Sequence, residues 1–250
     1  MDAYTKEEKE EIAEALDDLC SPNDNYGWAS AGIYSFWDYN TKEIFYIGLA
    51  VDLTERFKQH NGLIDFNEKC CKINEINEYF KNHNKLGYSI MVQSPLSQPM
   101  VNKNKELYKD FFDFNSPIED YTGEQGKESI KLMEGILIEL FRKKQGFLPK
   151  WNKIGGAIYG QRRAKNMKFD LLEAINSFEY NPLVARSSLR ELSNNPVYAE
   201  YEMDLHAVRM NMFNLGISFN ESFKVLKEMC TISQYKNIEE SNYLCKNLDL

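Results

Sequence analysis

Two short segments rich in aromatic and β-branched residues, separated by a polar turn, constrain the fold of this chain most strongly. Residues 32–37 read Gly-Ile-Tyr-Ser-Phe-Trp and residues 44–47 read Ile-Phe-Tyr-Ile, and such residue types are enriched in strands. Between them, residues 38–41 read Asp-Tyr-Asn-Thr, which favours a turn. We therefore predict that the two segments pair as a β-hairpin.

A helix is predicted directly after this hairpin. Asp52 can cap its N-terminus, and Asn61-Gly62 ends it. Arg56 and His60 are four residues apart and so lie on one face of the helix. The predicted hairpin carries Tyr34 and Tyr46, so an arginine and a histidine are expected beside two phenols.

The rest of the chain predicts an α+β protein. Apolar spacing indicates helices at residues 5–20, 72–84 and 128–144, and alternation at residues 87–93 indicates a third strand. We expect a small three-stranded sheet, antiparallel or mixed, flanked by helices. Residues 166–250 are expected to be helical throughout, with segments near residues 171–178, 198–213, 221–229 and 238–248.

The two tyrosine-containing triplets resemble the signature of the GIY-YIG nuclease family. Gly32-Ile33-Tyr34 is followed by Tyr46-Ile47-Gly48 at a spacing similar to that of the family. Arg56 falls in the next helix, as the arginine of the family does, and His60 matches a position that many members also fill. The resemblance covers roughly residues 28–155 and implies the GIY-YIG fold.

Two further positions match the same family. Glu134 lies in a predicted helix, where the family has a glutamate, and Asn152 follows, where the family has an asparagine. The resemblance implies that Glu134 binds one divalent cation, Mg²⁺ or alternatively Mn²⁺, and that Asn152 positions a helix or a phosphate. Glu139 is the neighbour most easily confused with Glu134, but it is a poorer match.

The resemblance also implies catalytic roles for the other four residues. Tyr34 would activate the attacking water, and Tyr46 would orient that water or bind phosphate. Arg56 would neutralise the scissile phosphate, and His60 would take the proton from Tyr34. Taken singly, each residue has a simpler interpretation: the tyrosines as strand aromatics, and His60 and Glu134 as solvated helix residues.

Charge is unevenly distributed along the sequence. The formal net charge is −8 and the isoelectric point about 5.1, which argues against a nucleic-acid partner. However, residues 1–30 and 170–250 are acidic, whereas residues 31–169 hold 21 Lys/Arg against 17 Asp/Glu. Residues 140–169 contain no acid and nine bases: Arg142, Lys143, Lys144, Lys150, Lys153, Arg162, Arg163, Lys165 and Lys168. This stretch is predicted to contact DNA phosphates, with a merely solvated basic surface as the alternative.

Three segments are expected on this basis. Residues 1–27 form an acidic helical arm, residues 28–165 a nuclease domain with an insertion at 94–127, and residues 166–250 a helical C-terminal extension. The insertion contains Lys103, Lys105 and Lys109, so it is either a DNA-contacting element or a packing excursion. The C-terminal extension is open to three interpretations: dimerisation, target reading, or covering the core.

Composition excludes several other classes of protein. No run of eighteen apolar residues exists, so no membrane-spanning helix is predicted. The N-terminus lacks the apolar core of a signal peptide, and a cytoplasmic location is expected. Five cysteines without zinc-type spacing predict reduced thiols, and no organic cofactor is expected.

The sequence therefore predicts a metal-dependent endonuclease acting on double-stranded DNA, most plausibly a type II restriction enzyme. The alternatives are a non-catalytic nucleic-acid-binding module, and a homing-type, repair-type or RNA nuclease of the same fold. Cutting both strands with one site per chain suggests a homodimer.

Overall fold

One antiparallel sheet of four strands organises the computed structural model, which describes residues 1–20, 30–65, 71–93, 124–165, 171–230 and 233–250. The strand order is β1-β4-β2-β3, and every neighbouring pair is antiparallel. The strands are β1 (Asp2–Tyr4), β2 (Gly32–Asp38), β3 (Ile44–Ala50) and β4 (Leu86–Val92). The α+β class is confirmed. We expected three strands, and the sheet has four. The alternative of a mixed sheet is wrong, because every pair of neighbouring strands is antiparallel.

The predicted hairpin forms as β2 and β3. Its turn is closed by Asp38, whose side chain accepts hydrogen bonds from the main-chain N–H groups of Asn40 and Thr41 at 2.9 and 2.7 Å. Every residue of β2 is buried, because β2 is an inner strand with helices on both of its faces. Side chains alternate between these faces, so Tyr34 and Phe36 enter one core and Ile33 and Trp37 the other.

The additional strand, β1, was missed because it is only three residues long and pairs with a distant segment. Ala3 lies opposite Gly87 of β4. Asp2 is fully buried, and its carboxylate accepts hydrogen bonds from the main chain and the guanidinium of Arg190, both at 3.0 Å. This contact across most of the chain length leaves no periodic signal in the sequence.

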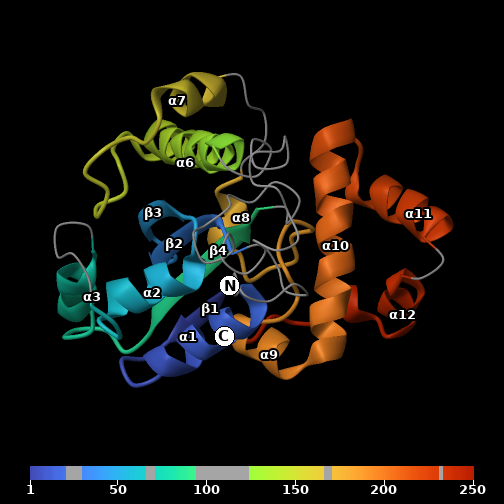
Figure 1. Cartoon of the computed structure of the whole chain (residues 1–250), viewed down its shortest axis with the longest axis horizontal. Helices are drawn as coiled ribbons and strands as arrows, with labels where there is room; N and C mark the ends of the chain where they lie inside the picture. The colour runs from blue at the N-terminus through green and yellow to red at the C-terminus, as the bar shows by residue number, and fades with distance from the viewer. Residues whose placement is uncertain (21–29, 66–70, 94–123, 166–170, 231–232) are drawn as a thin grey trace, which may run out of the picture.

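The helices cover both faces of the sheet (Figure 1). The described helices are α1 (Lys9–Cys20), α2 (Leu53–Asn61), α3 (Ile73–Tyr79), α6 (Glu124–Gln145), α7 (Ile158–Ala164), α8 (Glu173–Asn176), α9 (Leu189–Asn194), α10 (Pro196–Leu215), α11 (Phe219–Met229) and α12 (Tyr235–Glu240). Helices α1, α2 and α9 pack on the face that carries Tyr34, and α6 and α8 pack on the other.

Helices α10, α11 and α12 form a third apolar cluster of their own. In Figure 1, α10 runs along one side of the molecule, with α11 and α12 outside it. The helix expected at 238–248 ends earlier, at Glu240, because Asn242 adopts a left-handed conformation with φ 56°; a 3₁₀ turn, Tyr243–Cys245, follows. The helix expected at 171–178 shortens to α8.

The last residues of the chain return to the sheet. The carbonyl oxygen of Leu250 accepts hydrogen bonds from the Tyr39 hydroxyl and the Lys85 ammonium, both at 3.3 Å. The main-chain N–H of Leu189 donates to the carbonyl of Met1 at 3.3 Å.

The three expected segments remain a prediction. The insertion at 94–127 falls almost entirely outside the described residues.

Among the described residues, no helix is both long and apolar enough to cross a membrane.

Candidate active site

The hairpin brings the two tyrosines together. Tyr34 on β2 lies opposite Gly48 on β3, and the ring centroids of Tyr34 and Tyr46 are 5.7 Å apart. A Cβ atom at Gly48 would lie 2.8 Å from the Tyr34 hydroxyl oxygen and 2.6 Å from a Tyr46 ring carbon. Because real Cβ atoms do not approach so closely, glycine at this position is what lets the two rings converge.

Helix α2 delivers Arg56 and His60 to the same place. Its first turn is capped by Asp52, whose side chain accepts from the Glu55 N–H at 2.8 Å, and Gly62 ends it in the left-handed conformation with φ 72°. His60 is fully buried. Its Nε2 atom lies 2.7 Å from the Tyr34 hydroxyl oxygen.

Both ring nitrogens of His60 are engaged. The main-chain N–H of Lys72 donates to Nδ1 at 2.9 Å, while Nε2 faces Tyr34. Burial, together with the charges of Arg56 and Lys72, lowers the pKa of His60 to about 3. His60 is therefore a neutral imidazole at any pH near neutrality.

The two phenols are held in the protonated form by their surroundings. Burial raises the pKa of Tyr34 well above its ordinary value, while the nearby Arg56 opposes that rise. Burial also raises the pKa of Tyr46, and a hydrogen bond from Tyr34 lowers it. That hydrogen bond raises the pKa of Tyr34, so the pair is polarised toward the oxygen of Tyr46.

Glu134 approaches from the long helix α6. This helix packs against β3 and β2, and its Gly135 meets α7 so closely that a Cβ atom there would lie 2.5 Å from the Ala157 carbonyl oxygen. Glu134 is half-buried, and this burial raises the pKa of its carboxyl to about 7. Its charge also raises the pKa of Tyr46.

Glu139, the alternative carboxylate, has a different role. It is buried and forms a two-pronged ion pair with Arg142, at 2.8 and 2.7 Å. No hydrogen bond or ion pair to Glu134 occurs among the residues that the structure describes, so its acceptor oxygens are open to an added cation.

The donor set fits a weakly chelated hard cation. In the described part of the chain there is no group of three or more His, Cys, Asp or Glu side chains that would hold a metal. Mg²⁺ commonly binds through only one or two carboxylates and keeps several waters. A single desolvated carboxylate beside two phenols is consistent with that mode, and Glu134 is the residue that would hold the ion.

Asn152 clamps the outer strand of the hairpin. Its side-chain oxygen accepts from the Ile47 N–H at 3.0 Å, and its side-chain nitrogen donates to the Ile47 carbonyl at 2.8 Å. The neighbouring Trp151 N–H donates to the Phe45 carbonyl at 2.9 Å. Hydrogen bonds thereby hold the main chain on both sides of Tyr46, at Phe45 and at Ile47. Asn152 consequently acts on the strand that carries Tyr46, and these two bonds use only one of the two N–H groups of its side-chain amide.

Lys72 is a site residue that the sequence did not reveal. It is only 8% exposed, and its ammonium lies 5.1 Å from the centroid of the Tyr46 ring and 3.5 Å from the Glu75 carboxylate. Lysine at the start of a helix carries no functional signal of its own. Its proximity to Tyr46 depends on the packing of α3 against α2.

The basic stretch is divided between paired and free side chains. Arg142 is paired with Glu139, Lys143 donates to the Ala164 carbonyl at 2.9 Å, Lys144 lies 3.9 Å from Glu173, and Lys150 covers the Phe45 ring at 3.4 Å. The remaining described members are exposed and make no ion pair with another described residue: Lys153, Arg162, Arg163 and Lys165. Lys168 falls outside the described residues.

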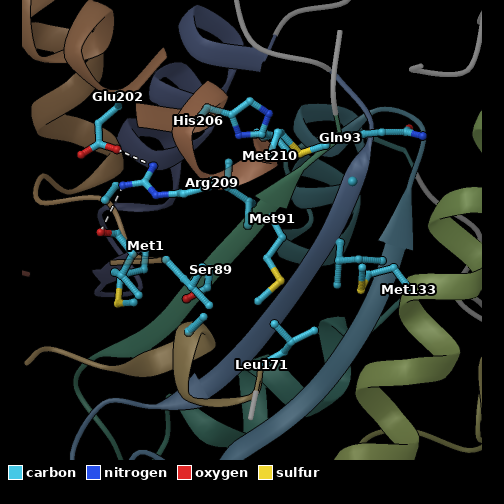
Figure 2. Close-up of a pocket in the computed structure, with 18 of the residues that line it drawn as sticks. Met1, Ser89, Met91, Gln93, Met133, Leu171, Glu202, His206, Arg209 and Met210 are labelled. Carbon is cyan, nitrogen blue, oxygen red and sulfur yellow. Dashed lines mark hydrogen bonds and ion pairs between the residues drawn. The ribbon is translucent and has the colours of Figure 1, made fainter. Parts of the chain in front are cut away.

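A separate apolar cavity of about 460 Å³ lies between the sheet, α6 and α10 (Figure 2). Met91 and Met133 line it, on the sheet face opposite Tyr34. Its carboxylate, Glu202, is already paired with Arg209 at 2.8 Å. His206 also lines the cavity, and its Nε2 atom has no hydrogen-bond partner among the described residues. The lining is otherwise mostly apolar, whereas the tyrosine cluster brings phenols, a guanidinium, an imidazole and a carboxylate under one another's influence.

In comparisons with known proteins, no protein-family model, no curated protein and no solved structure matches the chain.

Proposed function

We propose that this protein is a metal-dependent endonuclease that hydrolyses phosphodiester bonds of double-stranded DNA. The observation that carries this proposal is the convergence of side chains from four elements: Tyr34 from β2, Tyr46 from β3, Arg56 and His60 from α2, and Glu134 from α6. Tyr34 and His60 are buried, and Tyr46, Arg56 and Glu134 are half-buried, so each of these five polar or charged side chains is partly or wholly withdrawn from solvent.

Phosphodiester hydrolysis needs a deprotonated water, neutralised phosphoryl oxygens and a stabilised leaving oxygen. The tyrosine pair would accept the proton from the water once it is in the phenolate form, which burial disfavours and which Arg56 and a bound cation would favour. Arg56 is always charged and suits the non-bridging phosphate oxygens. Glu134 would hold Mg²⁺ or Mn²⁺, which when bound supplies a Lewis acid for the phosphate and the leaving oxygen.

The free cations on one side of this site favour a nucleic-acid substrate. Lys153, Arg162, Arg163 and Lys165 all follow the helix that carries Glu134, and helix α7 packs on that helix. Phosphate contacts from exposed Lys and Arg supply most sequence-independent affinity for DNA. A restriction-type enzyme acting as a homodimer is the form we favour, because one site per chain cuts one strand.

A plasmid assay tests the proposal directly. Supercoiled plasmid is incubated with the protein and MgCl₂, MnCl₂ or EDTA, and the nicked and linear forms are separated on a gel. We expect metal-dependent conversion that is lost in Glu134→Gln and Tyr34→Phe. Glu128→Gln is the matched control, since Glu128 is an exposed carboxylate on the same helix, paired with Lys131 at 2.6 Å.

The outcomes separate the alternatives. DNA binding without conversion by the wild-type protein would make it a non-catalytic binding module. Conversion of RNA but not of plasmid under the same conditions would make it an RNA nuclease. Sequencing the ends of digested plasmid would distinguish cutting at one short sequence from the sparse or structure-directed cutting of homing and repair enzymes.

A further inference from the structure

The direction of the hydrogen bonds around His60 can be read from one contact. A main-chain N–H can donate but cannot accept, so the Lys72 N–H, at 2.9 Å from Nδ1, requires Nδ1 to be unprotonated. A neutral imidazole then carries its single proton on Nε2. Because Nε2 is 2.7 Å from the Tyr34 hydroxyl oxygen, His60 donates a hydrogen bond to Tyr34.

The same direction continues through the tyrosine pair. Because Tyr34 accepts at its oxygen, its own hydroxyl hydrogen can be donated onward, and Tyr46 is the neighbouring phenol, with ring centroids 5.7 Å apart and an electrostatic coupling in the sense of a Tyr34 donor and a Tyr46 acceptor. The donors therefore run from Lys72 through His60 and Tyr34 to Tyr46. Hydrogen bonds aligned in series polarise one another. Tyr46, the less buried of the two rings, is where this chain ends.

The surroundings oppose any second proton on the imidazole. His60 is fully buried, and two cations, Arg56 and Lys72, act on it electrostatically. A positively charged imidazolium between two other positive groups is unfavourable. The only ring nitrogen without a proton is already occupied by the Lys72 N–H.

We propose that Lys72 is a positioning residue of this site, whose main-chain N–H fixes His60 as a hydrogen-bond donor to Tyr34. His60 then stabilises the phenolate form of the tyrosine pair, which arises when Tyr46, the less buried ring, releases its proton to solvent. His60 does not receive that proton, the reverse of the role that the family resemblance implied. This inference deepens the proposed nuclease function and rests on it for its catalytic consequence.

The side chain of Lys72 supports the same outcome. Its ammonium lies 5.1 Å from the Tyr46 ring centroid, so a phenolate at Tyr46 would gain a nearby cation. Glu75, at 3.5 Å, partly balances that charge when both tyrosines are protonated. The backbone and the side chain of one residue thus act on the two ends of the same hydrogen-bonded chain.

The tautomer can be measured without any cleavage reaction. The full-length chain is labelled with ¹⁵N-histidine, and the ring nitrogens of its three histidines are assigned with single His→Gln variants. We expect His60 to show a protonated Nε2 and an unprotonated Nδ1 from pH 5 to pH 8. A proton on Nδ1, or conversion to imidazolium within that range, would overturn the proposal.

Two substitutions at His60 separate a donor from a base. In His60→Gln the side-chain amide can still donate an N–H toward Tyr34 but has no basic nitrogen, whereas His60→Ala has neither. A donor role predicts that His60→Gln keeps cleavage within about 10-fold of wild type while His60→Ala falls about 100-fold. Equal losses in the two variants would show that His60 acts as a base.

Substitutions at Lys72 divide its two contributions. Lys72→Pro removes the N–H and the ammonium, Lys72→Met removes only the ammonium, and Lys72→Arg keeps the charge. The NMR tautomer should change in Lys72→Pro and persist in Lys72→Met. Lys81→Met is the matched control, because Lys81 is exposed and pairs with Glu78 three residues away, as Lys72 pairs with Glu75.

Failure of the two proposals would look different. A wild-type protein that cuts no substrate, yet shows the expected His60 tautomer, would refute the nuclease function and leave the positioning role of Lys72 intact. An active enzyme in which His60 is protonated on Nδ1 would refute the positioning role of Lys72 and leave the nuclease function intact. Circular dichroism shows whether Lys72→Pro folds. If it does not, the His60 tautomer in the NMR spectrum of the wild type and the cleavage rates of the two His60 variants still test the role of Lys72.

Discussion

Removing the charge of Glu134 should make the metal-free protein more stable at alkaline pH. Burial raises the pKa of this carboxyl from 4.5 to about 7, and no described residue neutralises it. A group whose pKa is raised by folding binds its proton more tightly in the folded than in the unfolded chain. Ionisation of Glu134 therefore has no effect on the free energy of unfolding below pH 4.5. It lowers that free energy progressively as the pH rises to about 7, and by a constant amount above that.

The size of the effect follows from the same interval. The difference between 4.5 and about 7 corresponds to about 3 kcal/mol at about 1.4 kcal/mol per pKa unit. Solvent screening of a half-buried side chain lowers this figure to about 2 kcal/mol. For a chain of this length, the midpoint of thermal unfolding should rise by about 4–8 °C in Glu134→Gln at pH 8, with little change at pH 4.5.

Urea denaturation of both proteins between pH 4.5 and pH 8, in EDTA, measures this difference. Magnesium at ten times its dissociation constant should stabilise wild type by about 1.4 kcal/mol at pH 8 and leave Glu134→Gln unchanged. The control is Glu139→Gln on the same helix: its pKa is lowered by the Arg142 pair, so the substitution should destabilise the protein at pH 8. Parallel pH profiles for wild type and Glu134→Gln would refute the reasoning.

The remaining predictions concern the hairpin and the cations. Arg56→Ala should reduce plasmid cleavage by about 10²–10³-fold with folding retained, while the neighbouring Lys58→Ala stays near wild type; equal rates would remove Arg56 from the site. Gly48→Ala places a methyl group 2.8 Å from the Tyr34 oxygen and should cost about 1–3 kcal/mol of stability together with most of the activity, as urea denaturation and the plasmid assay would show. Asn152→Ala loses both hydrogen bonds to Ile47 and should cost about 1–3 kcal/mol in urea denaturation, against no change for Lys153→Ala. Arg162→Ala with Arg163→Ala should reduce the slope of log affinity against log salt by about two in a fluorescence DNA-binding titration, and an unchanged slope would exclude α7 from the interface.

Local patterns predicted the hairpin and α2 well because their signals are confined to short stretches. Alternation and turn residues define β2 and β3, and Asp52 with Gly62 brackets α2. Once these elements form, Tyr34, Arg56 and His60 can meet only on one face of the sheet. That part of the candidate site was therefore accessible from the sequence.

Long-range contacts were not accessible in the same way. The three-residue strand β1 depends on Asp2 meeting Arg190 and on pairing with β4. Lys72 lies near the Tyr46 ring only because α3 packs against α2. The helical pattern placed Glu134 on α6, but only the packing of α6 against β3 brings its charge close enough to act on Tyr46. The direction of the His60 hydrogen bond likewise requires the Lys72 N–H.

The distribution of charge in the folded chain limits how a polyanion can approach. The acidic helix α1 lies on the sheet face of Tyr34, against α9 and α2, whereas α6 and α7 lie on the other side (Figure 1). Helix α7 ends in Arg162 and Arg163 with no acid in its first turn. A net charge of −8 repels a polyanion in general, so we expect attraction only at the side of the molecule where α7 packs on α6. Because Glu134 is on α6, we expect a duplex held here to approach the candidate site from the side of α6, while the acidic helix α1 shares the sheet face of Tyr34 and opposes an approach from that face.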